Sequence, residues 1–407
     1  MTASHMTLPS GKTPVYLDYN ATAPIRPEVI ETVAAVMGEV GNASSVHAFG
    51  RLARRRVEDA REALARLVNT RATRIIFTSG GTEANNLALR GAGRSRLMVS
   101  AGEHDSVLAV DPEAFQIPLK SCGRVDLEAL ADAIGEDGSD VLVSVMYANN
   151  ETGVIQPVRE IVELCHSRGA LCHCDAVQAL GKTPVDAMAL ETDFLTLSSH
   201  KIGGPQGVGA LVLGKGIDVL QQQVGGGQER RRRGGTENVA GIAGFGKAAE
   251  LAFEEVGNET SGNGEQKHNS LAVIRALRDD MEQRVRDIAP NAKVFGQNTE
   301  RLPNTSSVAM PGVPSDTQLM ALDLEGIAVS SGSACSSGKV QASHVMKAMG
   351  ATDEEAGSVL RFSLGWKSTQ EDVDRFVECW SALYERKGDK LHGDVSGDPA
   401  TEKQVNV

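Results

Sequence analysis

A lysine in the middle of the chain stands where side-chain chemistry could be carried out. It ends the stretch Leu195-Thr-Leu-Ser-Ser-His-Lys201, an apolar run that turns polar just before a Gly-Gly-Pro turn. The pattern predicts a buried strand that delivers its last side chains to one edge of a sheet. A lysine is costly to bury there unless it has a task, such as imine formation with a carbonyl cofactor. For a lone lysine, a surface position on a loop is the simpler interpretation.

A carboxylate at the end of a second apolar run changes that interpretation. Leu171-Cys-His-Cys-Asp175 is also strand-like, and Gln178 follows it closely. A strand-end aspartate can keep a pyridine nitrogen protonated, so that the ring acts as an electron sink, while a lysine holds the aldehyde of the same cofactor as an imine. Asp175 and Lys201 together therefore predict a site for pyridoxal 5′-phosphate (PLP).

A phosphate site is predicted where another strand turns into a helix. The stretch Phe77-Thr-Ser-Gly-Gly81-Thr82 offers glycines, hydroxyl groups and the free backbone N–H groups of a helix N-terminus, which bind anions. It is not a Walker motif, because no Gly-Lys-Ser/Thr follows. Glycine and threonine also occur in ordinary strand-to-helix turns, so the stretch is weak evidence when taken alone.

Two further polar side chains follow predicted strands. His104 ends the stretch Ser100-Ala-Gly-Glu-His104, and in a PLP site its imidazole could stack on the ring and move protons near neutral pH. Asn150 lies in Asn149-Asn-Glu151 and could contact the ring or the substrate. The simpler alternatives are a satisfied core histidine and an ordinary polar turn.

A cysteine near the C-terminus lies in a setting that favours reactivity. Cys335 belongs to residues 329–338, of which seven are serine or glycine, so the thiol is expected to be exposed on a hydrated loop. The alternative is a surface cysteine without a role. Arg361 lies in an apolar run and is expected to pair with a carboxylate, such as that of a substrate.

Two other clusters have weaker claims to function. Cys165, His166, Cys172, His173 and Cys174 resemble metal ligands, but Cys172 and Cys174 alternate with His173 along a predicted strand, so they cannot all face one ion. The basic runs at 51–56 and 230–233 are interpreted as a solvated helix face and an anion-contacting loop.

Composition excludes several classes of function. The 407 residues include 41 basic and 53 acidic side chains, and the net charge of −12 argues against a general affinity for nucleic acid or anionic membranes. No apolar run is long enough for a membrane span, and no signal peptide is recognised. Six cysteines do not form a disulfide framework in a chain of this size, so a cytoplasmic location is expected.

The predicted elements alternate between strand and helix. Strands are expected at 75–77, 97–99, 141–145, 170–174, 194–197 and 208–213, with helices such as 82–90 and 158–168 between them. This order predicts an α/β domain with a mostly parallel sheet, whose ligands bind at the carboxyl ends of the strands. The large domain is expected at 15–262, with its segment at about 15–28 able to pack with a smaller α+β domain at 263–386. Residues 1–14 and 387–407 are expected to be disordered, and 257–265 to form a polar loop.

These motifs together resemble the class I cysteine desulfurases of the nitrogen-fixation and iron–sulfur type. The resemblance covers about residues 15–384. It depends on Tyr16-Leu-Asp-Tyr-Asn20-Ala-Thr, Thr78-Ser-Gly-Gly-Thr-Glu83, Asn149-Asn-Glu151, Asp175-Ala-Val-Gln178, Ser198-Ser-His-Lys201, Gly225-Gly-Gly-Gln-Glu229, Gly235-Thr-Glu-Asn238, Ser331-Gly-Ser-Ala-Cys335 and Arg361-Phe-Ser-Leu-Gly365. It implies fold type I of the PLP-dependent transferases, a homodimer, and conversion of L-cysteine to L-alanine.

The resemblance also implies a role for each matching residue. Lys201 would hold PLP as an imine, His104 would stack on its ring, and Cys335 would take the sulfur as a persulfide. The remaining cofactor contacts would come from Gly81, Thr82, Asn150, Asp175, Gln178, Ser198, Ser199, His200 and, from the other subunit, Thr236.

Substrate and partners follow from the same resemblance. Asn150 and Arg361 would bind the substrate carboxylate, and the persulfide would pass to a sulfur-acceptor or iron–sulfur scaffold protein. No resident metal is implied, although Cys335 could transiently ligate an iron–sulfur cluster together with a scaffold. The acceptor pathway stays open among cluster assembly, tRNA thiolation, nitrogenase maturation and DNA sulfur modification.

The chain departs from the family pattern at a few positions. Ala43 replaces a usual proline, Trp366 a common arginine, and Gly203 an aromatic residue. Two alternatives to a desulfurase are another fold type I PLP enzyme, which would not need Cys335, and a non-enzymatic sulfur carrier, which would not bind PLP at Lys201.

Overall fold

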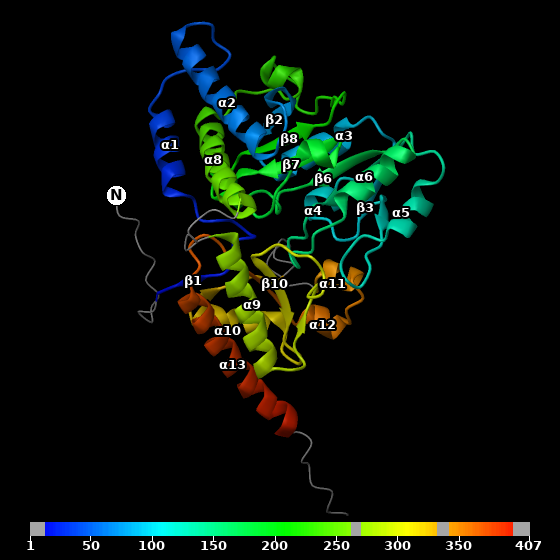
Figure 1. Ribbon diagram of the computed structural model, residues 1–407, viewed down its shortest axis with the longest axis vertical. Coiled ribbons are helices and arrows are strands. Elements are labelled where there is room, and N and C mark those ends of the chain that lie inside the picture. The colour runs from blue at the N-terminus through cyan, green and yellow to red at the C-terminus, as the bar shows by residue number, and fades with distance from the viewer. Residues whose placement is uncertain (1–12, 262–269, 332–341, 394–407) are drawn as a thin grey trace, which may run out of the picture.

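The computed structural model describes residues 13–261, 270–331 and 342–393. In Figure 1 a larger part, built around one sheet with helices on both sides, lies above a smaller part that ends in a long helix. Cys335 falls outside the described residues, as do the first twelve residues, the segment 262–269 and the last fourteen.

The larger part is built on a seven-stranded sheet with the order β2-β8-β7-β6-β5-β3-β4. Neighbouring strands from β4 to β7 are parallel, and β8 runs antiparallel to both β7 and β2. This confirms the predicted α/β class with a mostly parallel sheet. The strands are β2 (Ile75–Thr78), β3 (Arg96–Ser100), β4 (Phe115–Ile117), β5 (Val141–Met146), β6 (Leu171–Asp175), β7 (Phe194–Ser198) and β8 (Gly209–Leu213).

Hydrophobic cores lie on both faces of this sheet, because successive strand residues point to opposite sides. Ile75 and Phe77 of β2 belong to one core with α2, α5, α6 and α8, whereas Ile76 belongs to the other with α3 and α4. Burial on both faces explains why these strands read as continuous apolar runs. The helices are α1 (Pro27–Met37), α2 (Ala48–Leu67), α3 (Gly81–Gly91), α4 (Asp105–Leu108), α5 (Leu127–Ile134), α6 (Val158–Ser167), α7 (Ala187–Leu190) and α8 (Val239–Ser261).

The smaller part has its own core around a three-stranded antiparallel sheet. Trp380, Phe362 and Phe376 are fully buried there, and the two phenylalanine ring centroids are 4.4 Å apart. Its elements are α9 (Leu271–Ile288), β9 (Lys293–Val294), β10 (Thr305–Ala309), α10 (Ser315–Leu324), β11 (Ile327–Ala328), α11 (His344–Ala348), α12 (Asp353–Gly357), β12 (Val359–Ser363) and α13 (Gln370–Gly393).

The N-terminal segment crosses between the two parts. Strand β1 (Val15–Tyr16) pairs in parallel with β11, and Val15 and Leu17 are buried in the smaller core. The chain then turns back, and Ala23 N–H donates to the carbonyl of His200 in the larger part. This path places residues 18–23 next to the lysine-bearing end of β7.

Two predicted irregular segments are partly helical. Helix α8 continues to Ser261, although 257–265 was expected to be a loop, and α13 continues to Gly393, although a disordered tail was expected from 387. A polar composition argues against a packed core, but it does not exclude a helix, which satisfies its own backbone hydrogen bonds. None of the helices in the described ranges is both long and apolar enough to cross a membrane.

Candidate active site

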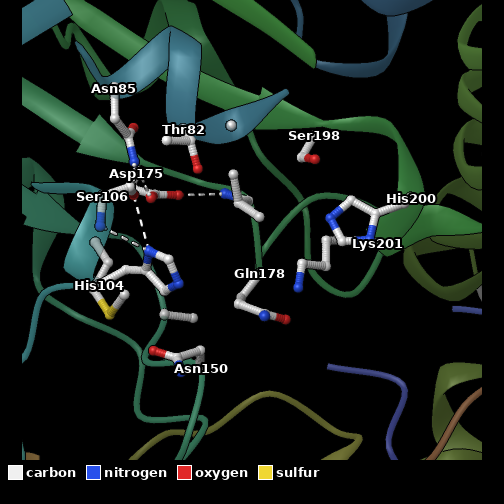
Figure 2. A pocket seen from close by; sticks show the side chains of 14 residues that line it. Thr82, Asn85, His104, Ser106, Asn150, Asp175, Gln178, Ser198, His200 and Lys201 are labelled. Atoms are coloured by element: carbon white, nitrogen blue, oxygen red, sulfur yellow. Dashed lines mark hydrogen bonds between the residues drawn. The ribbon is translucent and has the colours of Figure 1, made fainter. Parts of the chain in front are cut away.

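Nine of the predicted site residues line one cavity at the carboxyl ends of the parallel strands. The cavity has a volume of about 220 Å³, and Figure 2 shows the side chains that face it. Aspartate, histidine and lysine reach it from the ends of β6, β3 and β7, and the first turn of α3 forms one wall. The nine residues are Gly81, Thr82, His104, Asn150, Asp175, Gln178, Ser198, His200 and Lys201.

Asp175 is held in a fixed orientation at the end of β6. Its Oδ1 accepts from Val177 N–H at 2.9 Å, and its Oδ2 accepts from Asn85 Nδ2 at 2.8 Å, as the dashed lines in Figure 2 show. Only 6% of the residue is exposed. A carboxylate held in this way can face the protonated nitrogen of a pyridine ring without searching for its orientation.

Asn85 is a site residue that sequence analysis did not assign. It lies on α3 and lines the same cavity as Thr82, and its side chain also donates to Ser106 Oγ at 2.9 Å. Its position one helical turn after Thr82 is a signal that could have identified it, since residues three apart share one helix face.

The imidazole of His104 is oriented by the backbone that follows it. Ser106 N–H donates to His104 Nδ1 at 3.0 Å, so Nδ1 acts as an acceptor. In the neutral ring the proton is then on Nε2. The ring lines the cavity with Nδ1 tied to the start of α4, which leaves Nε2 for proton exchange.

Lys201 lies in a 3-10 turn (Ser199–Ile202) directly after β7. Its Nζ donates to the carbonyl oxygens of Asn20 at 2.6 Å and Ala21 at 2.9 Å. The neighbouring His200 contacts Thr22 through Nδ1 at 3.2 Å. Burial, followed by the positive charges of nearby Lys201 and Lys182, lowers the pKa of His200 to about 4, so the ring is neutral at neutral pH.

The N-terminus of α3 lies on the cavity wall. Gly81 is its first residue, and a Cβ there would lie 3.0 Å from Val177 Cγ2, so a side chain would crowd the wall. The backbone N–H groups of this turn, with Thr82 and Ser198 beside them, suit a phosphate. Phosphate donors, a carboxylate for a ring nitrogen and an amine for an aldehyde together fit PLP.

Two predicted cofactor contacts do not line this cavity. Ser199 is fully buried beside Gly204, where an added Cβ would lie 2.1 Å from Ser199 Oγ. Thr236 instead lines a separate cavity together with Glu229, Arg233 and Asn238. Thr236 therefore does not line the cavity that holds Lys201 and Asp175 in its own chain.

Arg361 is paired with a carboxylate, as predicted, but the carboxylate belongs to the chain itself. Its guanidinium donates to Asp18 Oδ1 at 2.8 Å and to the carbonyl of Asn150 at 3.3 Å. Arg361 is 5% exposed, and its Nε has no hydrogen-bond partner within the described part of the chain. A buried donor without a partner is ready to receive an acceptor from a ligand.

The loop that carries Cys335 lies outside the described residues, but both of its ends are described. Before the loop, Ser330 exchanges backbone hydrogen bonds with Arg361 at 2.7 and 3.2 Å. After it, Ser343 Oγ donates to Glu151 Oε2 at 2.6 Å, and His344 Nε2 contacts the carbonyl of Glu103 at 3.0 Å. The described residue Ser330 before the loop therefore lies beside Arg361, and Ser343 and His344 after it lie beside the segments that hold Asn150 and His104.

The possible metal cluster is divided between the two faces of the sheet. The side chains of Cys172 and Cys174 lie in the core beneath α6, whereas His173 contacts Ser144 through Nδ1 at 2.9 Å and Thr196 through Nε2 at 3.0 Å. Among the residues that the structure describes, no group of three or more His, Cys, Asp or Glu side chains could hold a metal ion.

Trp366 and Gly203, two of the positions at which the chain departs from the family pattern, both lie against Arg26. The guanidinium of Arg26 lies 4.7 Å from the Trp366 ring centroid, and Trp366 Nε1 donates to the carbonyl of Pro24 at 3.2 Å. A Cβ at Gly203 would lie 2.8 Å from Arg26 Cγ. Trp366 and the missing side chain at 203 are thus linked through Arg26, which itself pairs with Glu255 at 2.7 Å.

Comparisons with known proteins agree with this geometry. The family model "Aminotransferase class-V" matches residues 15–376. A cysteine desulfurase from Sinorhizobium fredii is 40% identical over 388 residues, which is 92% of this chain and 97% of the relative. Cysteine desulfurase IscS 1 from Archaeoglobus fulgidus is 41% identical over 385 residues, covering 91% and 97%.

The fold is also similar to that of solved structures. A NifS-like protein from Rickettsia africae superposes with a TM-score of 0.83 at 35% identity, covering 91% of this chain and 99% of that protein. The chain belongs to the aminotransferase class-V family, whose architecture is PLP fold type I. Within that family its relatives are the cysteine desulfurases, which confirms the resemblance recognised from the motifs.

Proposed function

We propose that this protein is a PLP-dependent cysteine desulfurase that converts L-cysteine to L-alanine and carries the sulfur as a persulfide on Cys335. The observation that supports this most directly is the convergence of Lys201, Asp175 and His104 on one cavity, next to the root of the Cys335 loop at Arg361. Another fold type I PLP enzyme would not need a thiol on such a loop.

The cofactor would be held by three kinds of contact. The N-terminus of α3, with Thr82, Ser198 and His200, would bind the phosphate, Asp175 would face the ring nitrogen, and Lys201 would hold the aldehyde. Once bound, PLP supplies the electron sink that makes the α-proton of the substrate removable. Asn150 and Gln178 would contact the ring from the remaining sides of the cavity.

The substrate carboxylate would be bound by Arg361, with help from Asn150. The buried Nε of Arg361 has no partner in the described residues, and the Asp18 contact holds the guanidinium in place. A planar guanidinium fixes a carboxylate in two directions, which would orient the Cα–H bond of cysteine towards Lys201 and His104.

The proposed sulfur transfer accounts for every bond, electron pair and proton. The Cys335 thiolate attacks the substrate sulfur, so an S–S bond forms while the Cβ–S bond breaks and its electron pair stays with the carbon skeleton. Protons delivered from Lys201 and His104 complete L-alanine, and Cys335 is left as a persulfide. An acceptor or iron–sulfur scaffold protein would then take the sulfur.

We further propose a cytoplasmic homodimer in which Thr236 serves the phosphate site of the other subunit. The separation of Thr236 from the Lys201 cavity of its own chain supports this arrangement. Exposed apolar side chains near α1 and α2, among them Met37, Val40 and Phe49, offer a surface that a second copy could cover.

The test is to measure L-alanine and persulfide formed from L-cysteine and a thiol reductant, with wild type and Cys335→Ala compared. We expect wild type to make both products, and Cys335→Ala to keep the visible absorbance of lysine-bound PLP while making neither. If Cys335→Ala is as active as wild type, Cys335 is not the nucleophile and another PLP lyase or transaminase becomes the better assignment. A protein that never acquires the absorbance would instead be a sulfur carrier without cofactor.

A further inference from the structure

A second lysine lies behind the cavity, in contact with one of the side chains that line it. Lys182 is 8% exposed, and its Nζ donates to Gln178 Oε1 at 2.7 Å and to Asn20 Oδ1 at 2.9 Å. Lys182 does not line the 220 Å³ cavity that holds Asp175 and His104, whereas Gln178 does. Lys182 can therefore act on the cavity through Gln178.

Two contacts hold the Gln178 amide in one orientation, one with Lys182 and one with the Asn20 backbone. Lys182 Nζ donates to Gln178 Oε1, so the amide oxygen faces the lysine. The amide nitrogen then points the other way, and one of its N–H groups donates to the carbonyl of Asn20 at 3.0 Å. Nε2 carries a second N–H, and because Gln178 lines the cavity, this group can donate to a ligand there. Figure 2 shows Gln178 among the lining side chains.

Asn20 connects this pair to Lys201 and to the smaller part of the molecule. Its backbone carbonyl accepts from Gln178 and also from Lys201 Nζ, at 2.6 Å. Its side chain accepts from Lys182 and from Asn304 Nδ2 at 3.1 Å, and donates to Thr305 Oγ1 at 2.9 Å. Lys182 thus holds both partners of this network, Gln178 and Asn20, at once.

Burial of Lys182 is unfavourable by itself. Its pKa is lowered well below the usual value, first by burial and then by the positive charges of Lys201 and Arg361. Either protonation state of the amine can donate the two hydrogen bonds, so the network survives deprotonation. A buried lysine that only filled space could be replaced by a leucine or methionine at lower cost.

We propose that Lys182 is a positioning residue that fixes the donor face of Gln178 towards the ring hydroxyl of PLP. The inference rests on the proposed function for the identity of the cofactor. A donor at this position stabilises the ionised ring oxygen, and therefore the deprotonated form of the chromophore that PLP makes with Lys201. Removing Lys182 takes away one of the two hydrogen bonds that hold the amide, and it should weaken that preference.

The test is a pH titration of the visible absorbance of the PLP-loaded protein. We expect Lys182→Met and Gln178→Leu each to raise the chromophore pKa by about one unit, a tenfold change in the protonation constant. The double variant should show the same rise as Gln178→Leu alone, since Lys182 acts through Gln178. If the charge of Lys182 instead acted directly through space, Lys182→Met would raise the chromophore pKa further in the Gln178→Leu background. Such additive pKa shifts in the double variant would overturn the proposal.

Controls separate positioning from a structural role. Lys247→Met removes a lysine that pairs with Glu250 on the surface of α8, and it should leave the titration unchanged. Lys182→Gln, which is shorter and uncharged, should raise the pKa in the same direction. An unchanged chromophore pKa in whichever Lys182 variant folds would overturn the proposal.

The same experiment separates this inference from the proposed function. If wild type shows the titrating absorbance but makes no alanine or persulfide, the reaction assignment fails while the role of Lys182 can still be measured. If wild type acquires no visible absorbance, the cofactor assignment fails, and the role of Lys182 fails with it.

Discussion

Asn85 on helix α3 donates a hydrogen bond to Asp175 at the end of strand β6, and 2.8 Å separates Nδ2 from Oδ2. Helix α3 also begins with Gly81 and Thr82, which line the same cavity. The group proposed to face the ring nitrogen and the turn proposed to hold the phosphate are therefore tied together by one helix. A cofactor that contacts both ends would bind to a preformed site.

We predict that Asn85→Ala weakens PLP binding without unfolding the protein. A hydrogen bond to a charged group contributes about 1.5–3 kcal/mol, so the dissociation constant should rise by about 10- to 100-fold. Fluorescence or absorbance titration of the cofactor-free protein with PLP measures this. Asn86→Ala is the matched control, because Asn86 is the next residue of α3 and its side chain contacts the Thr82 carbonyl and Arg90 Nε. Equal affinities for the two variants would contradict the prediction.

The Arg361 contact with Asp18 leads to a prediction about the substrate. Arg361→Lys keeps the charge but loses the planar group that can hold a carboxylate and Asp18 at the same time. We expect KM for L-cysteine to rise by about 10-fold or more, with a smaller change in kcat, because carboxylate binding is made in both the ground state and the transition state. Steady-state alanine formation measures both constants.

The control for this prediction is Arg375→Lys, which changes an arginine on α13 that contacts the carbonyls of Thr13 and Glu325. It should leave KM unchanged. A wild-type KM in Arg361→Lys would assign the substrate carboxylate to another group.

Glu103 gives a prediction about pH and stability. It is fully buried, Oε1 accepts from Ser144 Oγ at 3.1 Å, and Oε2 has no partner within the described residues. Burial, followed by the negative charge of Asp175, raises the pKa of Glu103 well above its ordinary value. Between the unfolded pKa and this raised value the folded state binds the additional proton, so the contribution of Glu103 to stability is lost as pH rises.

We therefore expect Glu103→Gln to be less sensitive to rising pH than wild type. Urea unfolding at pH 5 and pH 7.5 should show the variant gaining relative stability, by up to about 1.4 kcal/mol per pH unit within that window. His173, whose pKa burial lowers to about 4, contributes a slope of opposite sign that is common to both proteins and cancels in the difference. Parallel pH profiles for the two proteins would show that Glu103 titrates normally.

The sequence could identify chemistry that lies at strand ends, but not chemistry that depends on distant partners. Lys201, Asp175 and His104 were found because each follows an apolar run, and parallel strands bring such ends together. Asn85 and Lys182 were missed because their roles come from contacts with Asp175, 90 residues away, and Asn20, 162 residues away. Pattern and spacing could have pointed to Asn85 as a residue on the same helix face as Thr82, but they do not reveal a partner that lies so far away in the sequence.

For Arg361 the sequence predicted the type of partner but not which residue it is. Its position in an apolar run correctly predicted a carboxylate partner, since a buried guanidinium needs one. The partner is Asp18, 343 residues earlier in the chain, which the folding of the N-terminal segment onto β12 brings close. The burial of Arg361 was thus enough to predict a carboxylate partner, but only the folded structure shows that this partner is Asp18.

A buried ion pair beneath the Thr236 segment supports the last prediction. Arg61 on α2 forms a two-pronged pair with Glu229 at 2.8 and 2.9 Å, and Glu229 also accepts from Phe77 N–H at 2.9 Å. Glu229, Arg230 and Arg231 all have left-handed backbone angles, with φ of 43°, 57° and 66°. Such angles are unfavourable for residues with a side chain, so the pair helps to hold the turn in place.

We expect Arg61→Met to destabilise the protein by about 3–5 kcal/mol, because it leaves the Glu229 carboxylate buried without its partner. Arg61→Met with Glu229→Met should recover part of that loss, since neither charge is then left unpaired. Arg55→Met is the surface control on the same helix, where the pair with Asp59 is exposed and should contribute less than about 1 kcal/mol. Urea unfolding of the four proteins measures these differences. If Arg61→Met costs no more than Arg55→Met, the pair does not hold the turn, and the left-handed backbone must be stabilised by other contacts such as the Arg233–Glu83 ion pair at 2.8 Å.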